Sequence, residues 1–357
     1  MKERYQRHIQ LAAIGEAGQT KLAAARVLVV GAGGLGCPIL QYLTACGVGR
    51  IGIVDFDTVS LSNLHRQILY TEADVGKNKA QCAARRLSSM NSETRINVYP
   101  YGLTAENALD VVREYDLVVD GTDNFVTRYL LNDAVVLLDK PLVFGALYKF
   151  EGQVSVFNYE NGPTYRCLFP DPPAKNDVPN CNDIGVLGVL PGIIGLLQAL
   201  EVIKIITGTG EVLSGRVLHY DTLTHRQRIF KLKRNDVEIQ RVLAWGKPQR
   251  VVTDDCTIVN TLSLSELDRA GKDIFVDVRE RHETPRLSLP NLVELPLSEM
   301  ARGNVPEGLL RHQRKVVFCQ SGVRSRRAVG LLSAFGVPNC FALRDGAVAL
   351  GRWWNRE

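Results

Sequence analysis

The sequence predicts an α/β fold in which a mostly parallel sheet with an antiparallel extension is followed by a small α/β domain. Up to residue 147, short apolar stretches rich in valine and isoleucine alternate with helical patterns. This alternation is typical of parallel strands joined by crossover helices. At 152–159, polar and apolar residues alternate singly, which indicates an antiparallel strand with one buried face.

The elements of the first part are expected in regular order. Residues 4–22 predict one amphipathic helix or two short helices. Strands are predicted at 27–30, 50–57, 95–101, 116–120 and 141–147. Helices are predicted between these strands, from the glycine-rich turn to about residue 46, then at 76–90, 104–115 and 124–138.

The domain organisation is predicted from where this pattern changes. A buried helix at 186–207 and a hairpin of antiparallel strands at 216–233 complete a first domain, 1–233. Residues 234–256 show no sustained periodicity and are interpreted as a linker. A second domain is expected at 257–357, because the chain's 357 residues exceed the size at which one core stops growing.

The composition excludes several classes of protein. Hydrophobic residues make up 45% and charged residues 23% of the chain. These are ordinary values for a globular protein, and they argue against a disordered or fibrous one. The net charge of +5 is too small for a nucleic-acid-binding surface. The apolar segment 184–200 is interrupted by Pro191 and Gln198, so a core helix is expected rather than a membrane span. No secretory signal is recognised and none of the eight cysteines forms a CxxC pair, so a cytoplasmic protein is expected.

The stretch at 27–38, VLVVGAGGLGCP, predicts a buried strand that turns sharply into a helix N-terminus. Such a turn binds phosphate groups with backbone N–H groups and the positive end of the helix. Gly31-x-Gly-x-x-Gly36 followed by Asp55 gives the outline of a Rossmann-like nucleotide fingerprint. These residues alone leave NAD, FAD and ATP open, and a purely structural turn is the alternative.

Several further motifs make the prediction more specific. They are RYQRHI at 4–9, GAGGLG at 31–36, DFDTVSLSNLHRQ at 55–67, VGKNKA at 75–80, DGTDN at 120–124, YRC at 165–167 and CNDIGVLG at 181–188. Together they resemble the MoeB/ThiF family of adenylating enzymes in the ubiquitin-activating superfamily, over about residues 3–233. The resemblance implies that ATP activates the C-terminal glycine of a small ubiquitin-like sulfur-carrier protein of the MoaD/ThiS type. It also implies that NAD is not used.

The resemblance assigns roles to individual residues. Adenylation brings a carboxylate against the α-phosphorus of ATP, so a metal ion and cationic side chains must offset the repulsion between anions. Gly34 is expected against the nucleotide and Asp55 on the ribose hydroxyls. The phosphates are assigned to three polar residues, Asn63, Arg66 and Lys79. Mg²⁺ is assigned to Asp123, with Asn124 nearby. Arg7 is expected near the nucleotide and Arg66 in the neighbouring protomer's site, which implies a homodimer; individually, these cations could be solvated surface charges.

Two cysteines carry separate expectations. Cys181 lies in a loop before an apolar helix, a position that can activate a thiol as a nucleophile. The resemblance implies a transient bond between Cys181 and the carrier, and the alternative is an inert, half-buried thiol. MoeB-like relatives bind zinc through two CxxC pairs, but here Thr164 replaces one cysteine and leaves Cys167 alone. No structural zinc is expected, because one thiol cannot build a four-thiolate site.

The second domain contains Asp277-Val-Arg279 after a predicted strand and CQSGVRS at 319–325 before a predicted helix. These motifs resemble a rhodanese-like sulfurtransferase domain over about residues 257–354. A ring of backbone N–H groups at the helix start would stabilise a thiolate or persulfide. The expected persulfide loop comprises Cys319, Gln320, Ser321, Gly322, Val323 and Arg324. Phosphatase loops usually hold one more residue between cysteine and arginine, so sulfur transfer is favoured.

The combined prediction is carrier adenylation, followed by attack of a Cys319 persulfide to form a carrier thiocarboxylate. Cys181 would resolve the acyl disulfide or hold the carrier. The expected partners are a Gly-Gly carrier and a sulfur donor such as a cysteine desulfurase, with no nucleic acid and no membrane. Two alternatives are an NAD- or FAD-dependent oxidoreductase and a non-catalytic carrier-binding scaffold.

Overall fold

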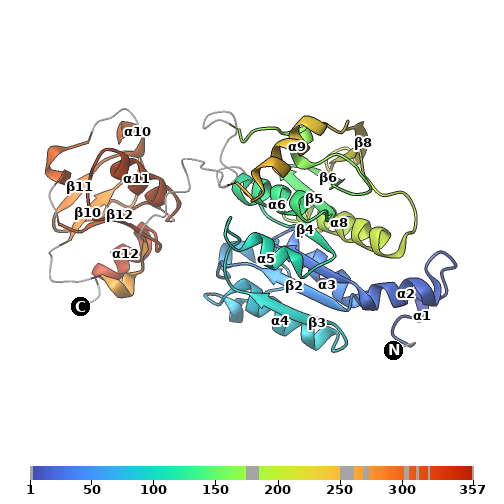
Figure 1. Ribbon diagram of the computed structural model, residues 1–357. Coiled ribbons are helices and arrows are strands. Elements are labelled where there is room, and N and C mark those ends of the chain that lie inside the picture. Colours follow the sequence, from blue (N-terminus) through green and yellow to red (C-terminus); the bar gives the residue numbers. More distant parts are fainter. Residues whose placement is uncertain are drawn as a thin grey trace. The chain divides into compact units, whose positions relative to one another are not determined.

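The computed structural model consists of two compact units, residues 1–251 and 252–357 (Figure 1). Each unit has its own sheet and core and is described by itself. The structure describes residues 3–173, 185–249, 261–267, 273–300, 305–310, 313–320 and 322–355. Cys181 and Ser321 therefore lie outside the described residues.

The first unit is built on an eight-stranded sheet in the order β3-β2-β1-β4-β5-β6-β7-β8. Neighbours from β3 to β5 pair parallel, and β5 to β8 pair antiparallel. The predicted parallel sheet with an antiparallel extension is confirmed. The strands are β1 (Arg26–Val30), β2 (Arg50–Val54), β3 (Arg95–Tyr99), β4 (Leu117–Asp120), β5 (Leu142–Tyr148), β6 (Glu151–Phe157), β7 (Arg216–Asp221) and β8 (Arg226–Lys231).

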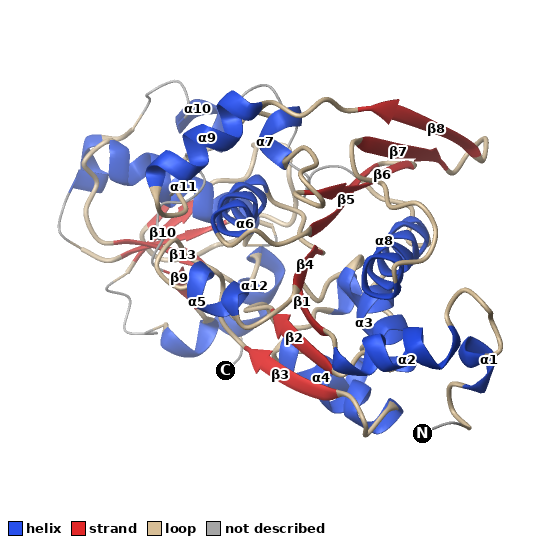
Figure 2. Ribbon diagram, turned by 45° about the vertical axis from the view of Figure 1, so that its right-hand side comes forward, coloured by secondary structure: helices blue, strands red, loops and turns tan. Residues whose placement is uncertain are grey.

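Helices cover both faces of this sheet, with α6 on one side and α8 on the other (Figure 2). Alternate residues of β1 explain the two layers: Val27 and Val29 pack into one core with α3 and α8, and Leu28 and Val30 into the other with α5 and α6. The helices are α1 (Gln6–Ile9), α2 (Gly15–Ala24), α3 (Gly36–Ala45), α4 (Lys79–Met90), α5 (Ala108–Arg113), α6 (Phe125–Leu137), α7 (Tyr165–Leu168), α8 (Leu190–Thr207) and α9 (Asp236–Trp245).

Helix α8 corresponds to the apolar segment that was expected to be a core helix. It is the one helix among the described residues that is long and apolar enough to cross a membrane. Half of it is buried in the protein, where it packs on α3, β5 and β6. Gln198 is fully buried at its centre and donates to the backbone carbonyl of Asp120 at 2.7 Å. These contacts support the core-helix interpretation.

The stretch predicted as a linker, 234–256, contains helix α9, which belongs to the first unit. Asn235 caps this helix by accepting a hydrogen bond from the backbone N–H of Val237 at 3.1 Å. Ile239 and Val242 are buried against Val136 of α6. The helix was missed because only a few apolar side chains, one turn apart, hold it on the protein.

The second unit is an α/β domain with a five-stranded parallel sheet in the order β11-β10-β12-β13-β9. Ser263 begins a 3-10 turn, Leu264–Glu266, which is closed by reciprocal hydrogen bonds between Ser263 and Glu266. The strands are β9 (Thr261–Leu262), β10 (Ile274–Asp277), β11 (Leu292–Glu294), β12 (Lys315–Phe318) and β13 (Cys340–Leu343). The helices are α10 (Leu297–Met300), α11 (Val323–Ala334) and α12 (Ala347–Trp354).

A buried ion pair joins α6 and α7 in the first unit. Arg166 donates from Nε to one oxygen of Asp133 at 2.7 Å and from Nη2 to the other at 3.0 Å. The side chain of Arg166 is 3% exposed and that of Asp133 is 0% exposed. The guanidinium also stacks near the rings of Tyr129 and Trp245, so it ties α9 to the core.

We predict that Arg166→Met destabilises the protein by about 3 kcal/mol, because it leaves the Asp133 carboxylate buried without its cation. Calorimetric unfolding of the full chain measures this loss. Arg113→Met is the matched control, since Arg113 is 58% exposed in a surface pair with Asp110. The control should change stability by less than about 0.5 kcal/mol; equal effects of the two variants would contradict the prediction.

Candidate functional site

A cavity of about 610 Å³ lies at the carboxyl ends of the parallel strands β1, β2 and β4. The strand ends contribute Val30, Val54 and Gly121 to its wall. This volume lies in the usual range for small-molecule sites, and the position is the one expected for ligands of such sheets.

The glycine turn forms one wall of the cavity and leaves no room for a side chain at two positions, Gly31 and Gly36. Gly31 has a positive φ of 93°, and a Cβ there would lie 2.6 Å from the carbonyl oxygen of Gly121. A Cβ on Gly36 would lie 2.0 Å from the carbonyl oxygen of Gly31. The turn can therefore be built only with glycine at these positions, and it directs the N-terminus of α3 to the cavity.

Asp55, at the end of β2, holds the turn in place. One carboxylate oxygen accepts from the backbone N–H of Ala32 at 2.8 Å, and the other from the N–H of Asp57 at 2.9 Å. Burial raises the pKa of the Asp55 carboxyl. The carboxylate lines the cavity and can accept hydrogen bonds from ligand hydroxyl groups.

Four cationic side chains line the same cavity: Arg66, Lys79, Arg128 and Lys149. Lys79, at the start of α4, is 8% exposed, and its Nζ lies 3.0 Å from a carboxylate oxygen of Asp57. Arg66 donates to the carbonyl oxygen of Ser62 at 3.1 Å, which leaves further guanidinium N–H groups for a ligand. This concentration of positive charge suits a polyphosphate.

A buried pair below the cavity positions the loop after β4. Asp120 accepts from the backbone N–H of Thr122 at 2.9 Å and from its hydroxyl at 2.6 Å. Its other oxygen lies 3.3 Å from Nε of Arg128, which also donates to the carbonyl of Thr122. Burial raises the pKa of the Asp120 carboxyl, and Arg128 opposes that shift. The loop thus presents Asp123 with its side chain exposed at the cavity.

The structure brings most of the predicted nucleotide residues together. Those lining the cavity are Gly34, Asp55, Arg66, Lys79, Asp123 and Asn124. Asn63 is absent from the described lining residues; its backbone carbonyl accepts from the N–H groups of Arg66 and Gln67 at 3.0 and 2.9 Å. Arg7 is exposed on α1 and is likewise absent from that lining. Arg66, expected in a neighbouring protomer's site, lies at the cavity of its own chain.

The lining also contains polar residues that were not predicted from the sequence, among them Gln67, Arg128 and Lys149. Gln67 is buried, and its Oε1 atom has no hydrogen-bond partner in the described part of the chain. Its position at the end of the quoted 55–67 motif was the available signal. Arg128 lies one helical turn after Asn124, which caps α6. Lys149 reaches the cavity from the turn between β5 and β6, for which the sequence carries no signal.

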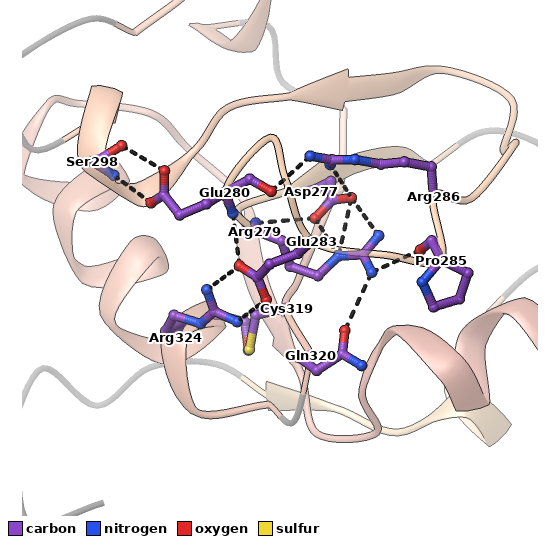
Figure 3. Close-up of polar contacts among 11 residues, drawn as sticks. Asp277, Arg279, Glu280, Glu283, Pro285, Arg286, Ser298, Cys319, Gln320 and Arg324 are labelled. Atoms are coloured by element: carbon purple, nitrogen blue, oxygen red, sulfur yellow. Dashed lines mark hydrogen bonds and ion pairs between the residues drawn. The ribbon is translucent and has the colours of Figure 1, made fainter. Parts of the chain in front are cut away.

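The second unit places the predicted persulfide residue at the end of β12 (Figure 3). Cys319 is fully buried, and its Sγ lies 3.9 Å from the hydroxyl oxygen of Ser325. Gly322 has a positive φ of 83°, and a Cβ there would lie 2.4 Å from the carbonyl oxygen of Arg344. Helix α11 starts directly after it, so the loop returns the positive end of the helix towards the cysteine.

The Asp277-Val-Arg279 motif supports this loop from below. Arg279 and Asp277 form a fully buried ion pair at 2.7 Å. Arg279 also donates to the carbonyl of Pro285 at 2.9 Å and to the side-chain oxygen of Gln320 at 3.3 Å, next to Cys319. Arg324 of the loop forms an ion pair with Glu283.

Cys167, the cysteine that lacks a CxxC partner, forms hydrogen bonds with the backbone. Its sulfur accepts hydrogen bonds from the backbone N–H groups of Thr164 and Asn235, both at 3.2 Å. No cluster of three or more histidine, cysteine or acidic side chains suited to a metal occurs in the ranges that the structure describes. The absence of zinc stays a prediction.

A family model and several known proteins match this chain. The ThiF family model matches residues 5–240. A "Sulfur carrier protein adenylyltransferase" of Thermus thermophilus is 54% identical over 238 residues, or 65% of this chain and 88% of that protein. "Adenylyltransferase and sulfurtransferase MOCS3-1" of Zea mays is 42% identical over 98% of this chain and 81% of its own length.

Two further similarities extend the comparison. "Probable adenylyltransferase/sulfurtransferase MoeZ" of Mycobacterium tuberculosis is 40% identical over 97% of this chain and 92% of its own length. Among solved structures, E. coli MccB matches with a TM-score of 0.59 and 24% identity, covering 66% of this chain and 71% of that one. At this identity the likeness supports the fold alone.

We predict that Gly36→Ala destabilises the protein by about 2–3 kcal/mol, because its Cβ cannot be placed without moving the glycine turn. Gly33→Ala is the control, since a Cβ there would meet only the side-chain nitrogen of Gln67, at 3.5 Å. It should cost less than about 1 kcal/mol. Thermal unfolding of both variants tests the difference. An unchanged stability of Gly36→Ala would show that the turn is not sterically fixed.

Proposed function

The chain belongs to the ThiF family, and we propose from this premise that it activates a small ubiquitin-like sulfur carrier and then transfers sulfur to it. The relatives that match nearly the whole chain are named adenylyltransferases and sulfurtransferases, and this chain is an enzyme of that kind. The observation that carries the proposal is one cavity in which the glycine turn meets Asp55, Arg66, Lys79 and Asp123.

The residues of the cavity fit ATP. The glycine turn offers backbone N–H groups at the N-terminus of α3, and the Gln67 oxygen, which has no hydrogen-bond partner among the described residues, offers an acceptor. Asp55 would accept from the ribose hydroxyls, and Arg66 and Lys79 would hold phosphate oxygens. ATP supplies an electrophilic α-phosphorus and pyrophosphate as the leaving group. Family membership implies the use of ATP.

The chemistry of the first step follows from charge. The carrier's terminal carboxylate attacks the α-phosphorus, the bond to the β-phosphate oxygen breaks, and an acyl-adenylate forms as pyrophosphate leaves. Lys79 and Arg66 offset the repulsion between the carboxylate and the phosphates, and their ion-pair and hydrogen-bond partners hold them in place beforehand. Asp123, exposed at the cavity, is the proposed Mg²⁺ ligand.

The second step is assigned to Cys319. A persulfide on Cys319 attacks the acyl carbon of the adenylate, AMP leaves, and an acyl disulfide forms. A thiol then attacks the Cys319 sulfur of that acyl disulfide, forms a new disulfide with Cys319, and releases the carrier thiocarboxylate as the S–S bond breaks. Cys181 is proposed as this thiol or as a residue that holds the carrier; its role rests on the resemblance, since it lies outside the described residues.

We further propose a homodimer and a protein sulfur donor such as a cysteine desulfurase. Arg7 is exposed on α1 and does not line the described cavity of its own chain, so a second copy is the simplest way to bring it to a nucleotide. The names of the relatives do not support the two alternatives, an NAD- or FAD-dependent oxidoreductase and a non-catalytic scaffold. A cytoplasmic location and the absence of zinc also remain proposals.

We predict that Cys319→Ala abolishes thiocarboxylate formation but keeps carrier-dependent exchange of pyrophosphate into ATP. The reason is that the cysteine and the nucleotide cavity belong to different units. Intact mass of candidate Gly-Gly carriers measures the replacement of one oxygen by sulfur, and isotope exchange measures adenylation. Cys340→Ala, also buried in the second unit, is the control and should keep both. Loss of both activities in Cys319→Ala would contradict this division of labour.

A further inference from the structure

An acidic side chain from a separate turn reaches the arginine of the persulfide loop (Figure 3). Arg324 donates from Nη1 to one oxygen of Glu283 at 2.5 Å and from Nη2 to the other at 2.6 Å. Hydrogen bonds from Arg324 lower the pKa of Glu283 to about 2, so this carboxyl is ionised near neutral pH. The same pairing raises the pKa of Arg324. The loop arginine therefore carries a neutralising partner.

The turn that holds Glu283 is fixed by the fold. The backbone N–H of Glu280 donates to the Glu283 carboxylate at 2.8 Å, and the Glu280 side chain accepts from the hydroxyl of Ser298 at 2.8 Å. Arg286 donates to the carbonyl of Glu280 at 2.7 Å and to Asp277 at 3.3 Å. The position of Glu283 thus follows from several contacts besides the ion pair itself.

We propose that Glu283 sets the sulfur-donor specificity of the Cys319 loop by cancelling the charge of Arg324. The loop then disfavours small dianionic donors such as thiosulfate and accepts persulfide donors of low charge. This inference rests on the proposed sulfur-transfer function and names the donor class for the same site.

The two donor classes place different charges at the loop. A Cys319 thiolate that attacks the outer sulfur of a persulfide, R–S–SH, breaks its S–S bond, and the electron pair leaves with the thiolate R–S⁻. The proton stays on the transferred sulfur. With thiosulfate the leaving group is sulfite, so two negative charges approach the thiolate and must be held there. A free arginine assists that approach, and a paired one does so weakly.

The other charges of this region do not replace Arg324. Arg279 is fully buried against Asp277. Arg281 is 71% exposed and pairs with Glu299 at 3.0 Å. Arg326 and Arg327 are exposed on α11 and add a general positive field that salt screens. Among these groups, the Glu283–Arg324 pair lies directly on the loop.

The test uses the full chain and two donors, thiosulfate and cysteamine persulfide, whose ammonium group offsets the negative charge of the persulfide when it is ionised. Glu283→Gln keeps the shape and one acceptor oxygen but removes the negative charge. We expect kcat/KM for loading Cys319 from thiosulfate to rise about tenfold, from the attraction between an unmasked arginine and a dianion. Loading from cysteamine persulfide should change less than about twofold. The thiosulfate gain should shrink as salt is added.

Three variants serve as controls. Glu299→Gln removes the same charge from a surface pair and should leave both rates unchanged. Glu283→Asp keeps the charge and should keep the wild-type preference, even if the turn shifts. Arg324→Gln combined with Glu283→Gln restores a neutral pair and should abolish the thiosulfate gain.

The outcomes separate this inference from the proposed function. An unchanged or lower thiosulfate rate in Glu283→Gln, with normal persulfide loading, would overturn the specificity role alone. An equal rise with both donors would also overturn it, because the effect would then lie in the reactivity of Cys319. If neither donor loads sulfur onto Cys319 in the wild-type chain, the sulfur-transfer function fails and the inference fails with it.

Discussion

The contact between the glycine turn and the loop after β4 is the constraint on which the first unit depends. Gly31, Gly36 and Gly121 pack backbone against backbone, at separations that admit no Cβ. This close approach lets β1 turn directly into α3 and brings the ends of β1, β2 and β4 to one cavity. Asp55 then fixes the turn, and four cationic side chains line the same cavity. Because the chain belongs to the ThiF family, ATP is the expected ligand of this cavity, although the turn alone would equally suit a dinucleotide.

Buried ion pairs repeat as supports for the reactive loops. Asp120 and Arg128 hold the loop that carries Asp123, and Asp277 and Arg279 hold the loop that carries Cys319. In each case an aspartate near a strand end is buried and its arginine also donates to backbone carbonyls. Such pairs contribute little net stability, but breaking one leaves an unpaired buried charge. They therefore fix the positions of the loops that carry Asp123 and Cys319.

The succession of strands and helices along the chain and the glycine turn could be predicted because both follow from local patterns, the spacing of apolar residues and the need for a positive φ at Gly31. Most cavity residues lie within the quoted motifs, so the resemblance located them. Lys149 was not predictable, because only the folding back of β5 on β6 brings it to the cavity. The Glu283–Arg324 pair joins residues 41 positions apart, and no local pattern indicates it.

The most direct test of the account is carrier-dependent exchange of pyrophosphate into ATP by Lys79→Met, compared with Lys77→Met. Lys77 is exposed and donates to the carbonyl of Ala73. Lys79 lies only two positions further along the chain, but its side chain is almost fully buried at the cavity. Loss of Lys79 should lower the exchange rate by about 100-fold, as for the removal of one donor placed at a developing charge. Lys77→Met should retain the wild-type rate. Equal rates for the two variants would contradict the assignment of this cavity as the site of adenylation.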